Sequence, residues 1–179
     1  MNNALTISRI ENVDIAELAN LVNSAYRGES SKKGWTTEAD LLDGQRTDQK
    51  TLEELIQKNG SIILSARNEA AQIIGCVYLQ QEDHQLYLGM LTVAPDIQAK
   101  GIGKYLMLAA ENYAREIKCT SIIMKVIDIR HELIDWYKRK GYQSTGRTTP
   151  FPSDPAFGLP KIPLQFIELE KKLYHSNCY

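Results

Sequence analysis

The chain has 179 residues, and its 21 lysines and arginines nearly balance its 22 aspartates and glutamates, which gives a formal net charge of −1. This length fits a single domain over residues 1–179 with a sizeable core. The balanced charge favours neither nucleic acid nor an anionic membrane as a partner, and no apolar run reaches the roughly 20 residues of a membrane span. Because the first residues also lack a signal-peptide pattern, we expect a cytoplasmic protein.

The three cysteines do not indicate a disulfide scaffold or a metal site. Cys76, Cys119 and Cys178 are scattered along the chain, odd in number, and none belongs to a C-x-x-C pair. Paired thiols at regular spacing are the signature of both kinds of site. We therefore expect a reduced protein that holds no metal.

The predicted elements alternate between strands and helices, as in an α/β protein. In the first third of the chain we expect a strand at residues 5–10, a helix capped by Asp14 that runs to Tyr26, a short helix beginning at residues 36–38, and a helix that begins with the capping box of Thr51 and Glu54 and ends near Gly60. A hairpin of strands 61–67 and 71–80, a central strand at 85–93 and a helix at 105–117 follow. The last part is expected to form a strand from Ile122, a helix that stops at Gly141, an irregular loop at 148–163 and a strand at 164–173. Helices are placed where apolar residues recur at helical spacing, and strands where apolar and β-branched residues run between turn residues.

The stretch from Leu88 to Leu106 carries the strongest functional signal. An apolar strand passes through Pro95 into the turn Gln98-Ala99-Lys100-Gly101-Ile102-Gly103 and then into a helix. The N-terminus of a helix offers unpaired N–H groups and the positive end of its dipole, which together bind phosphate. Glycines let the backbone approach the anion, and Lys100 and Lys104 add positive charge. The pattern is neither a dinucleotide fingerprint nor a Walker loop, because the third glycine and the Ser/Thr are missing.

A second patterned block spans Ile122 to Tyr142. It consists of a β-branched strand, a short break, a helix, and a glycine stop at Gly141. Tyr137 lies on this helix, four residues before the glycine. A tyrosine at helical spacing is often a core residue, so the residues alone leave Tyr137 as either core or functional.

Together the two blocks resemble the GCN5-related N-acetyltransferase (GNAT) superfamily. The first is similar to its Gln/Arg-x-x-Gly-x-Gly/Ala motif after a strand ending in V-x-P, and the second to its Y-x-K-x-G-F/Y ending. The resemblance implies a mixed, mostly antiparallel twisted sheet flanked by helices, whose splayed central strands, with a bulge near residues 91–93, form the acetyl-CoA groove. The cofactor-binding residues that it implies are Leu91, Val93, Gln98, Ala99, Lys100, Gly101, Ile102, Gly103, Lys104 and Arg130. It also implies that Tyr137 protonates the departing thiolate of coenzyme A.

The chain departs from the family pattern in three places, one of which is Arg139 in place of the usual lysine two positions after Tyr137. Arg130 stands where the family usually has an asparagine; it could reach a phosphate or the acceptor, or pair with Asp135. The strand at 85–93 lacks the glutamate that many members use as general base. The candidates that remain for this role are Glu29, Glu38, Glu82, Asp83 and His84, with backbone carbonyls and ordered water as the alternative.

Two segments, residues 26–46 and 149–158, are expected to shape the acceptor pocket. The candidate pocket residues in them are Glu29, Trp35 and Phe151, although the aromatic ones could equally pack on the flank of the domain. Arg27 and Arg46 hint at an acceptor that carries a carboxylate or a phosphate.

These patterns predict an enzyme that moves an acetyl group from acetyl-CoA to a primary amine of a small molecule or peptide by direct attack on the thioester. The alternative is a catalytically weak acyl-CoA-binding module on the same scaffold, which the missing strand glutamate and Arg130 favour. Nucleic acid and membranes are not expected partners, and a homodimer is left open.

Overall fold

The structure, a computed structural model, describes residues 5–98 and 100–174. Its helices are α1 (Ile15–Tyr26), α2 (Gly28–Ser31), α3 (Gln49–Gln57), α4 (Ile102–Glu116) and α5 (His131–Arg139), with short 3-10 turns at Asn12–Asp14, Pro95–Ile97 and Pro155–Phe157. Its strands are β1 (Thr6–Arg9), β2 (Leu42–Asp43), β3 (Ser61–Arg67), β4 (Ile73–Glu82), β5 (Gln85–Val93), β6 (Ser121–Ile127), β7 (Gln143–Pro150), β8 (Leu159–Pro160) and β9 (Gln165–Lys172).

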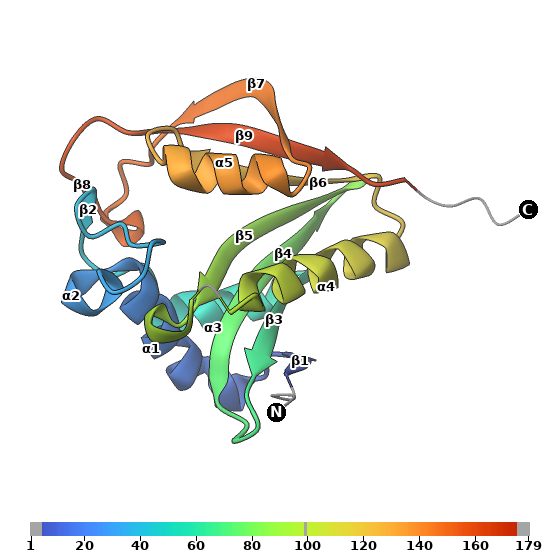
Figure 1. Cartoon of the computed structure of the whole chain (residues 1–179), viewed down its shortest axis with the longest axis horizontal. Coiled ribbons are helices and arrows are strands. Elements are labelled where there is room, and N and C mark those ends of the chain that lie inside the picture. The colour runs from blue at the N-terminus through green and yellow to red at the C-terminus, as the bar shows by residue number, and fades with distance from the viewer. Residues whose placement is uncertain (1–4, 99, 175–179) are drawn as a thin grey trace, which may run out of the picture.

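Seven of the strands form one sheet in the order β1-β3-β4-β5-β6-β9-β7, while β2 and β8 pair separately. Every neighbouring pair in the large sheet is antiparallel except β5 and β6, which are parallel. Figure 1 shows helices flanking this sheet. The predicted fold class, a mixed and mostly antiparallel sheet flanked by helices, is confirmed.

The helices cover both faces of the sheet because successive strand side chains point to opposite faces. Leu64 of β3 joins the core beneath α4 and α5, whereas its neighbour Ile63 joins the core beneath α1 and α3. The first core includes Leu106 of α4 and Tyr137 of α5, and the second includes Leu18 of α1. The sheet therefore separates two layers, and a molecule can pass between them only where neighbouring strands part.

The strands part between β5 and β6. Their pairing ends at Tyr87 and Ile123, after which β5 stays with β4 as far as Val93 and β6 stays with β9 as far as Ile127. In Figure 1 the two strands diverge from the end where they pair. The splayed central strands that the family resemblance implied are therefore present.

A β-bulge lies on the free edge of β5. Tyr78 pairs with Gly89 and Cys76 with Thr92, so Met90 and Leu91 together stand opposite the single residue between them on β4. Met90 has a φ of +50°, a value that non-glycine residues rarely adopt and that is found where function over-determines the backbone. A bulge re-aims side chains and leaves backbone groups unpaired, which makes this edge suited to binding.

Two of the expected helix starts differ in the structure. No helix begins at residues 36–38, because the Thr37 hydroxyl bonds Ser31 and the N–H of Ala39 and so competes with helix formation. The preceding residues 28–31 form α2 instead. α3 is capped by Asp48, whose carboxylate accepts from the N–H of Thr51, so the cap lies three residues before the expected one.

Other helix and strand boundaries differ from the predicted ones at glycine and proline residues, which the prediction treated as the ends of elements. α4 begins at Ile102, so Gly103 lies within its first turn instead of before it. Residues 148–150 belong to β7 and are not irregular. Pro150 is tolerated there because β7 is an edge strand, where a missing N–H leaves no partner unsatisfied. Asp14 precedes α1 as expected, but its carboxylate bonds Glu11 and Arg67 and makes no cap bond to α1.

Candidate active site

Two cavities meet at the gap between β5 and β6. One, of about 390 Å³, lies against the start of α4 and is called the groove below; the other, of about 550 Å³, lies on the side of α1 and β7 and is called the acceptor cavity. The residues that line both are Tyr26, Leu91, Leu133 and Tyr137. A molecule in the groove and a second one in the acceptor cavity would therefore meet at these side chains.

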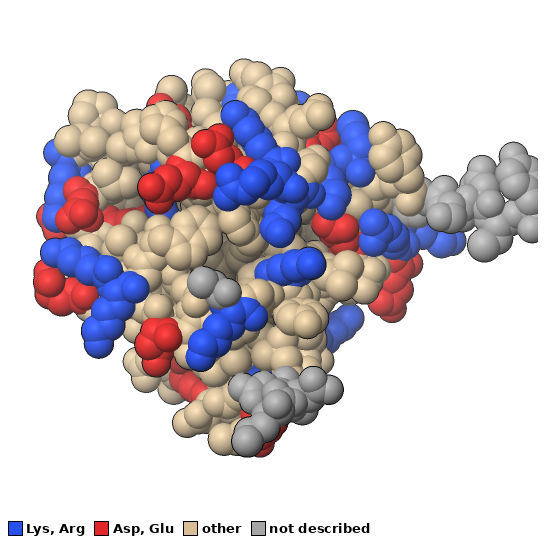
Figure 2. Space-filling model, viewed as in Figure 1, with Lys and Arg blue, Asp and Glu red and all other residues tan. Residues whose placement is uncertain are grey.

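The wall of the groove at α4 is built for an anion. Gly101, the residue before the helix, has a φ of +81°, in the left-handed region that favours glycine. The first helical backbone bond runs from the N–H of Tyr105 to the carbonyl of Gly101, so the N–H groups of residues 102–104 have no partner within the helix. Lys104 and Lys140 line the same groove. Figure 2 shows lysine and arginine side chains gathered around a hollow between α4 and α5.

The middle of the groove has room for a narrow chain. A Cβ placed on Gly103 would meet only Val93 and Trp136, both at 3.8 Å, which is ordinary van der Waals contact. Trp136 and Trp35 form an aromatic wall, with ring centroids 5.9 Å apart. The open helix terminus, the bulged edge of β5 and this wall fit the pyrophosphate and pantetheine arm of a coenzyme A thioester.

Gln98 connects the groove to the loop after α2. Its side-chain carbonyl accepts from the N–H of Trp35, while its amide donates to the hydroxyl of Thr36 and to the carbonyl of Val93. The side chain is thus occupied within the protein, which leaves the backbone of Gln98 for a phosphate. The carbonyl of Val93 is bonded by Gln98 on the side of the gap and not by β4. Because the N–H and the carbonyl of one residue in an antiparallel strand point to the same side, the N–H of Val93 faces the gap as well.

Tyr137 is the aromatic centre of the wall that the two cavities share. Its side chain is only 6 % exposed and packs edge-on against Trp136 and Tyr142. Burial raises the pKa of Tyr137 well above its ordinary value of 10.0, with smaller contributions from the neighbouring tyrosines. The phenol is therefore protonated throughout the neutral range and can act as a proton donor, and the packing shows that it is a core residue too.

Tyr26 belongs both to the apolar face of α1 and to the segment 26–46 that is expected to shape the acceptor pocket, and it lines both cavities. Its hydroxyl donates a hydrogen bond to the carbonyl of Leu91, at the bulge. Burial, with a smaller effect of Glu38, raises the pKa of Tyr26 to about 12. Tyr26 is the last residue of α1, and the sequence predicted its place near the acceptor pocket but not its hydrogen bond to Leu91.

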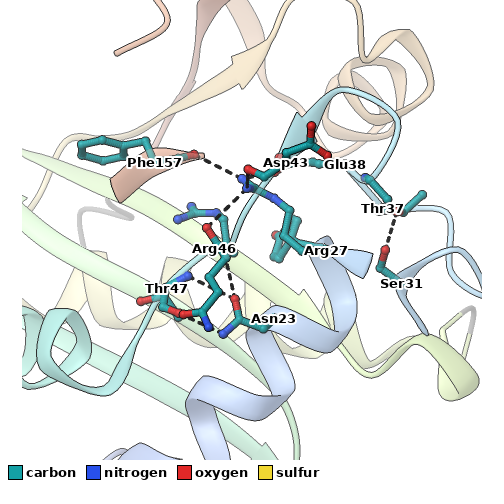
Figure 3. A network of polar contacts seen from close by, with 12 residues as sticks. Asn23, Arg27, Ser31, Thr37, Glu38, Asp43, Arg46, Thr47 and Phe157 are labelled. Atoms are coloured by element: carbon teal, nitrogen blue, oxygen red, sulfur yellow. Dashed lines mark hydrogen bonds and ion pairs between the residues drawn. The ribbon is translucent and has the colours of Figure 1, made fainter. Parts of the chain in front are cut away.

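An ion-pair bridge closes one side of the acceptor cavity. Glu38 pairs with Arg27 at 3.1 Å through one oxygen and with Arg130 at 3.8 Å through the other. Arg27 also donates to the carbonyls of Asp43, Gln45 and Phe157, and Figure 3 shows it at the centre of this network. Burial lowers the pKa of Arg27, and Glu38 offsets part of that shift. The bridge joins α1, the following loop and the start of α5.

For Arg130 the sequence leaves several contacts open: the cofactor, a phosphate, the acceptor or Asp135. It lines the acceptor cavity and not the groove, and its guanidinium donates to the carbonyl of Trp35. The pairing with Asp135, one of these alternatives, is not formed; Asp135 pairs with Lys138 one turn along α5. A role for Arg130 in binding the cofactor stays a prediction.

The structure brings most, but not all, of the predicted site residues together. The groove is lined by Leu91, Val93, Gln98, Gly101, Ile102, Gly103 and Lys104. Trp35, which is expected in the acceptor pocket, lines the groove instead, while Phe151 lines the acceptor cavity and stacks on Phe166. Lys100 borders a separate depression, and Glu29 is exposed and pairs with Lys32. Ala99 lies outside the described residues.

The candidate general bases are not gathered at the gap. Glu82, Asp83 and His84 form the turn between β4 and β5, and neither cavity includes them. Among the described residues that line the two cavities, Glu38 is the one carboxylate, and both of its oxygens face guanidinium groups. The structure therefore supplies no free side-chain base from the predicted set.

Two other features of the described ranges bear on function. Within residues 5–98 and 100–174, no helix has both the length and the apolar character needed to cross a membrane. The same residues contain no group of three or more histidine, cysteine, aspartate or glutamate side chains placed to hold a metal ion.

Comparison with known proteins identifies the family. The family model described as "Acetyltransferase (GNAT) family" matches residues 15–142. A GNAT-family acetyltransferase from Staphylococcus aureus Mu50 is 19 % identical with a TM-score of 0.69, over 96 % of this chain and 100 % of that one. The ribosomal-protein-S18-alanine N-acetyltransferase of Escherichia coli is 14 % identical with a TM-score of 0.71, over 98 % and 99 % of the two chains. A ribosomal-protein-alanine N-acetyltransferase from Brucella melitensis is 21 % identical with a TM-score of 0.70, over 94 % and 99 %.

At these identities the solved structures establish the fold alone, and a search of curated proteins gave no significant match. The family model spans both patterned blocks of the sequence, including the start of α4 and Tyr137. On this evidence the chain belongs to the GNAT family of acetyltransferases.

Proposed function

We propose that this protein is an acetyl-CoA-dependent N-acetyltransferase that acetylates a primary amine by direct attack on the thioester. One observation carries the proposal: Tyr137, a buried and protonated phenol, lies in the wall shared by the groove and the acceptor cavity. A proton donor is needed at the place where a thiolate leaves. The GNAT membership of the chain supports the same reaction.

Each part of the site has a role in this proposal. Acetyl-CoA, when bound, supplies the activated acetyl group. The unpaired N–H groups at the start of α4, with Lys104 beside them, bind the pyrophosphate. The N–H groups at the bulged edge of β5, at Leu91 and Val93, polarise the thioester carbonyl as an oxyanion hole does. Tyr137 donates its proton to the sulfur of the leaving group.

The amine must lose a proton without a dedicated side-chain base. Glu38 has both oxygens directed at guanidinium groups, so its charge is engaged within the protein. We propose that water, held by backbone carbonyls at the gap, takes the proton. This arrangement favours an acceptor whose amine is already partly neutral, such as an α-amine with a pKa near 7.7–8.0, over a lysine-like amine near 10.4.

The test is the release of free coenzyme A from acetyl-CoA with pools of amino acids, N-terminal peptides, lysine peptides, polyamines and aminoglycosides. We expect release with at least one pool, with an α-amine as the acceptor. Binding of acetyl-CoA, measured separately by calorimetry, distinguishes the outcomes. Tight binding with no release from any pool would contradict the proposal and favour the acyl-CoA-binding module.

A further inference from the structure

We propose that the acceptor is a small primary amine that also bears a carboxylate or phosphate group, and that Arg46 binds this anion. The inference rests on the proposed function and specifies its substrate class. It starts from the charges of the acceptor cavity, whose walls include Arg27, Arg46, Lys125 and Arg130 against the single carboxylate of Glu38.

The cations do not all remain available to a ligand. Arg27 is 7 % exposed, pairs with Glu38 and donates to three backbone carbonyls, so it holds the loops together. Arg130 shares Glu38 and donates to the carbonyl of Trp35. The one carboxylate among the described residues that line the cavity is therefore used by these two arginines, and neither Arg46 nor Lys125 forms an ion pair within the described part of the chain.

Arg46 is held in position but has a free guanidinium. The backbone N–H of Arg46 donates to the side-chain carbonyl of Asn23 at 2.7 Å, and the guanidinium lies 5.6 Å from the centre of the Tyr26 ring. Within the described part of the chain the guanidinium has no hydrogen bond and no ion pair. Figure 3 shows Arg46 in the same close-up as Arg27 and Phe157. A stacked, planar guanidinium with unused donors is suited to bind a carboxylate or phosphate through two bonds.

Lys125 adds a second cation from the opposite strand. Its neighbours Met124 and Val126 are buried in the core, while Lys125 itself is exposed and lines the acceptor cavity. Among the described residues it has no ion pair. Lys125 stands opposite Glu168 in the pairing of β6 with β9, and Glu168 itself pairs with Arg147. An anion in the cavity would be attracted by both Arg46 and Lys125.

Tyr26 fixes the distance between the anion and the reacting centre. The face of its ring carries Arg46, and its hydroxyl bonds the carbonyl of Leu91 at the bulge. The anion site and the thioester site are thus separated by about one tyrosine ring. A compact molecule with both an amine and an anion, such as an amino acid, spans that separation, and the apolar side chains of Met90, Phe151 and Phe166 are placed to contact its body.

The test compares acceptors that carry or lack the anion, with kcat/KM expressed per neutral amine, because the anion also raises the pKa of the amine. We expect kcat/KM for phenylalanine to exceed that for phenylalaninamide, and that for phosphoethanolamine to exceed that for ethanolamine, by roughly 10- to 100-fold, as for a charge-assisted hydrogen bond. The pair with the larger ratio identifies the carboxylate or the phosphate as the natural group. In Arg46→Gln the ratio should fall to near 1.

The control is Arg9→Gln. Arg9 also lies over a tyrosine ring, that of Tyr113 at 5.8 Å, but it lines neither cavity. This variant should keep the wild-type ratios. An equal loss in both variants, or a wild-type preference for the uncharged member of each pair, would overturn the role of Arg46.

A binding measurement keeps the inference testable without turnover. N-acetylphenylalanine and its amide, titrated by calorimetry into the protein loaded with coenzyme A, require no catalysis. Tighter binding of the acid, lost in Arg46→Gln, supports the inference even where no acetyl transfer occurs, and in that case only the proposed function fails. Equal binding of acid and amide contradicts the inference, whatever the activity.

Discussion

The groove and the acceptor cavity meet at Tyr137, but they are assembled in different ways. The groove takes half of its lining residues from one short stretch, the end of β5 and the start of α4, which offers a ligand the unpaired backbone groups of the helix terminus. The acceptor cavity is lined by residues of α1, β5 and β6, by the loops before and after β2, and by the region after β7. It offers a ligand mainly side chains. The groove can therefore be read in a local motif, whereas the acceptor cavity depends on contacts between distant residues.

The same difference decides how strongly the ligand of each cavity depends on single side chains. Backbone N–H groups at a helix terminus bind phosphate whatever the neighbouring side chains are. The charges of the acceptor cavity come from single residues such as Arg46 and Lys125, and replacing either would change which acceptor fits. The fold alone accordingly does not determine the acceptor.

The largest expected effect is at the residue that belongs to both cavities. Tyr137→Phe should lower kcat by roughly 10²- to 10⁴-fold, the range for loss of a general acid, and leave the Kd for acetyl-CoA nearly unchanged, because the ring still packs against Trp136. Steady-state kinetics and calorimetry measure the two quantities.

Tyr142→Phe is the matched control for that variant. Tyr142 is also buried, and its ring centre lies 5.9 Å from that of Tyr137, but its hydroxyl has no hydrogen-bond partner among the described residues. Removing an unsatisfied hydroxyl should leave kcat unchanged and keep or raise Tm. Similar kcat losses in both variants would mean that Tyr137 acts only through packing.

The second effect tests the ion-pair bridge of the acceptor cavity. Glu38→Gln leaves Arg27 and Arg130 without a countercharge at a site where the paired side chains are 6 % and 13 % exposed. Breaking such a buried pair costs about 3 kcal/mol, which for a chain of this size lowers Tm by roughly 6–12 °C. Acceptor KM should rise, while the Kd for acetyl-CoA should change little.

Glu29→Gln removes an exposed carboxylate nearby and serves as the comparison. Its pair with Lys32 lies in solvent, with side chains 88 % and 45 % exposed, and exposed pairs contribute little. Thermal denaturation should show no measurable change in Tm for this variant. A Glu38→Gln protein as stable as Glu29→Gln would show that the bridge does not hold the cavity.

The third effect tests the groove. Gly101→Val places a β-branched residue at a φ of +81°, where nothing within 4 Å would clash with a Cβ, so the strain is purely conformational. The backbone should shift to relieve it, misplacing the N–H groups of α4 and raising the Kd for acetyl-CoA roughly 10-fold or more. Calorimetry measures this change.

Gly146→Val is subject to the same strain away from the groove. Gly146 also has a φ of +81° and open space around it, but it lies in the edge strand β7. We expect a loss of stability with an unchanged Kd for acetyl-CoA. If both variants weakened acetyl-CoA binding equally, the effect of Gly101→Val would reflect general destabilisation.

The smallest expected change is in the pH dependence. Because the pKa of Tyr137 is raised well above 10.0, the phenol keeps its proton as the pH increases. kcat/KM should therefore rise with pH as the acceptor amine becomes neutral and show no falling limb below about pH 10. A falling limb between pH 7 and 9 in the pH–rate profile would contradict the assignment of Tyr137 as the acid.

The sequence supported the elements whose signals are local. The strand β5, the turn before α4, the helix α5 and its stop at Gly141, which has a φ of +94°, follow from periodicity and glycine placement within a few residues. It failed where side chains compete with the backbone, as at Thr37, and where an edge position tolerates proline, as at Pro150. Such outcomes depend on neighbours that only the folded chain provides.

By itself, the sequence determined that a glycine-containing turn and a helix start follow a central strand, an arrangement suited to bind phosphate, and that Tyr137 lies a fixed distance before a helix stop, because these depend on residues adjacent in the chain. The tertiary structure decided that Tyr26 bonds the bulge, that Glu38 joins two arginines, and that Arg46 is left free. These contacts join residues that are far apart in sequence, and charge compensation can be assessed only when all partners of a group are in place.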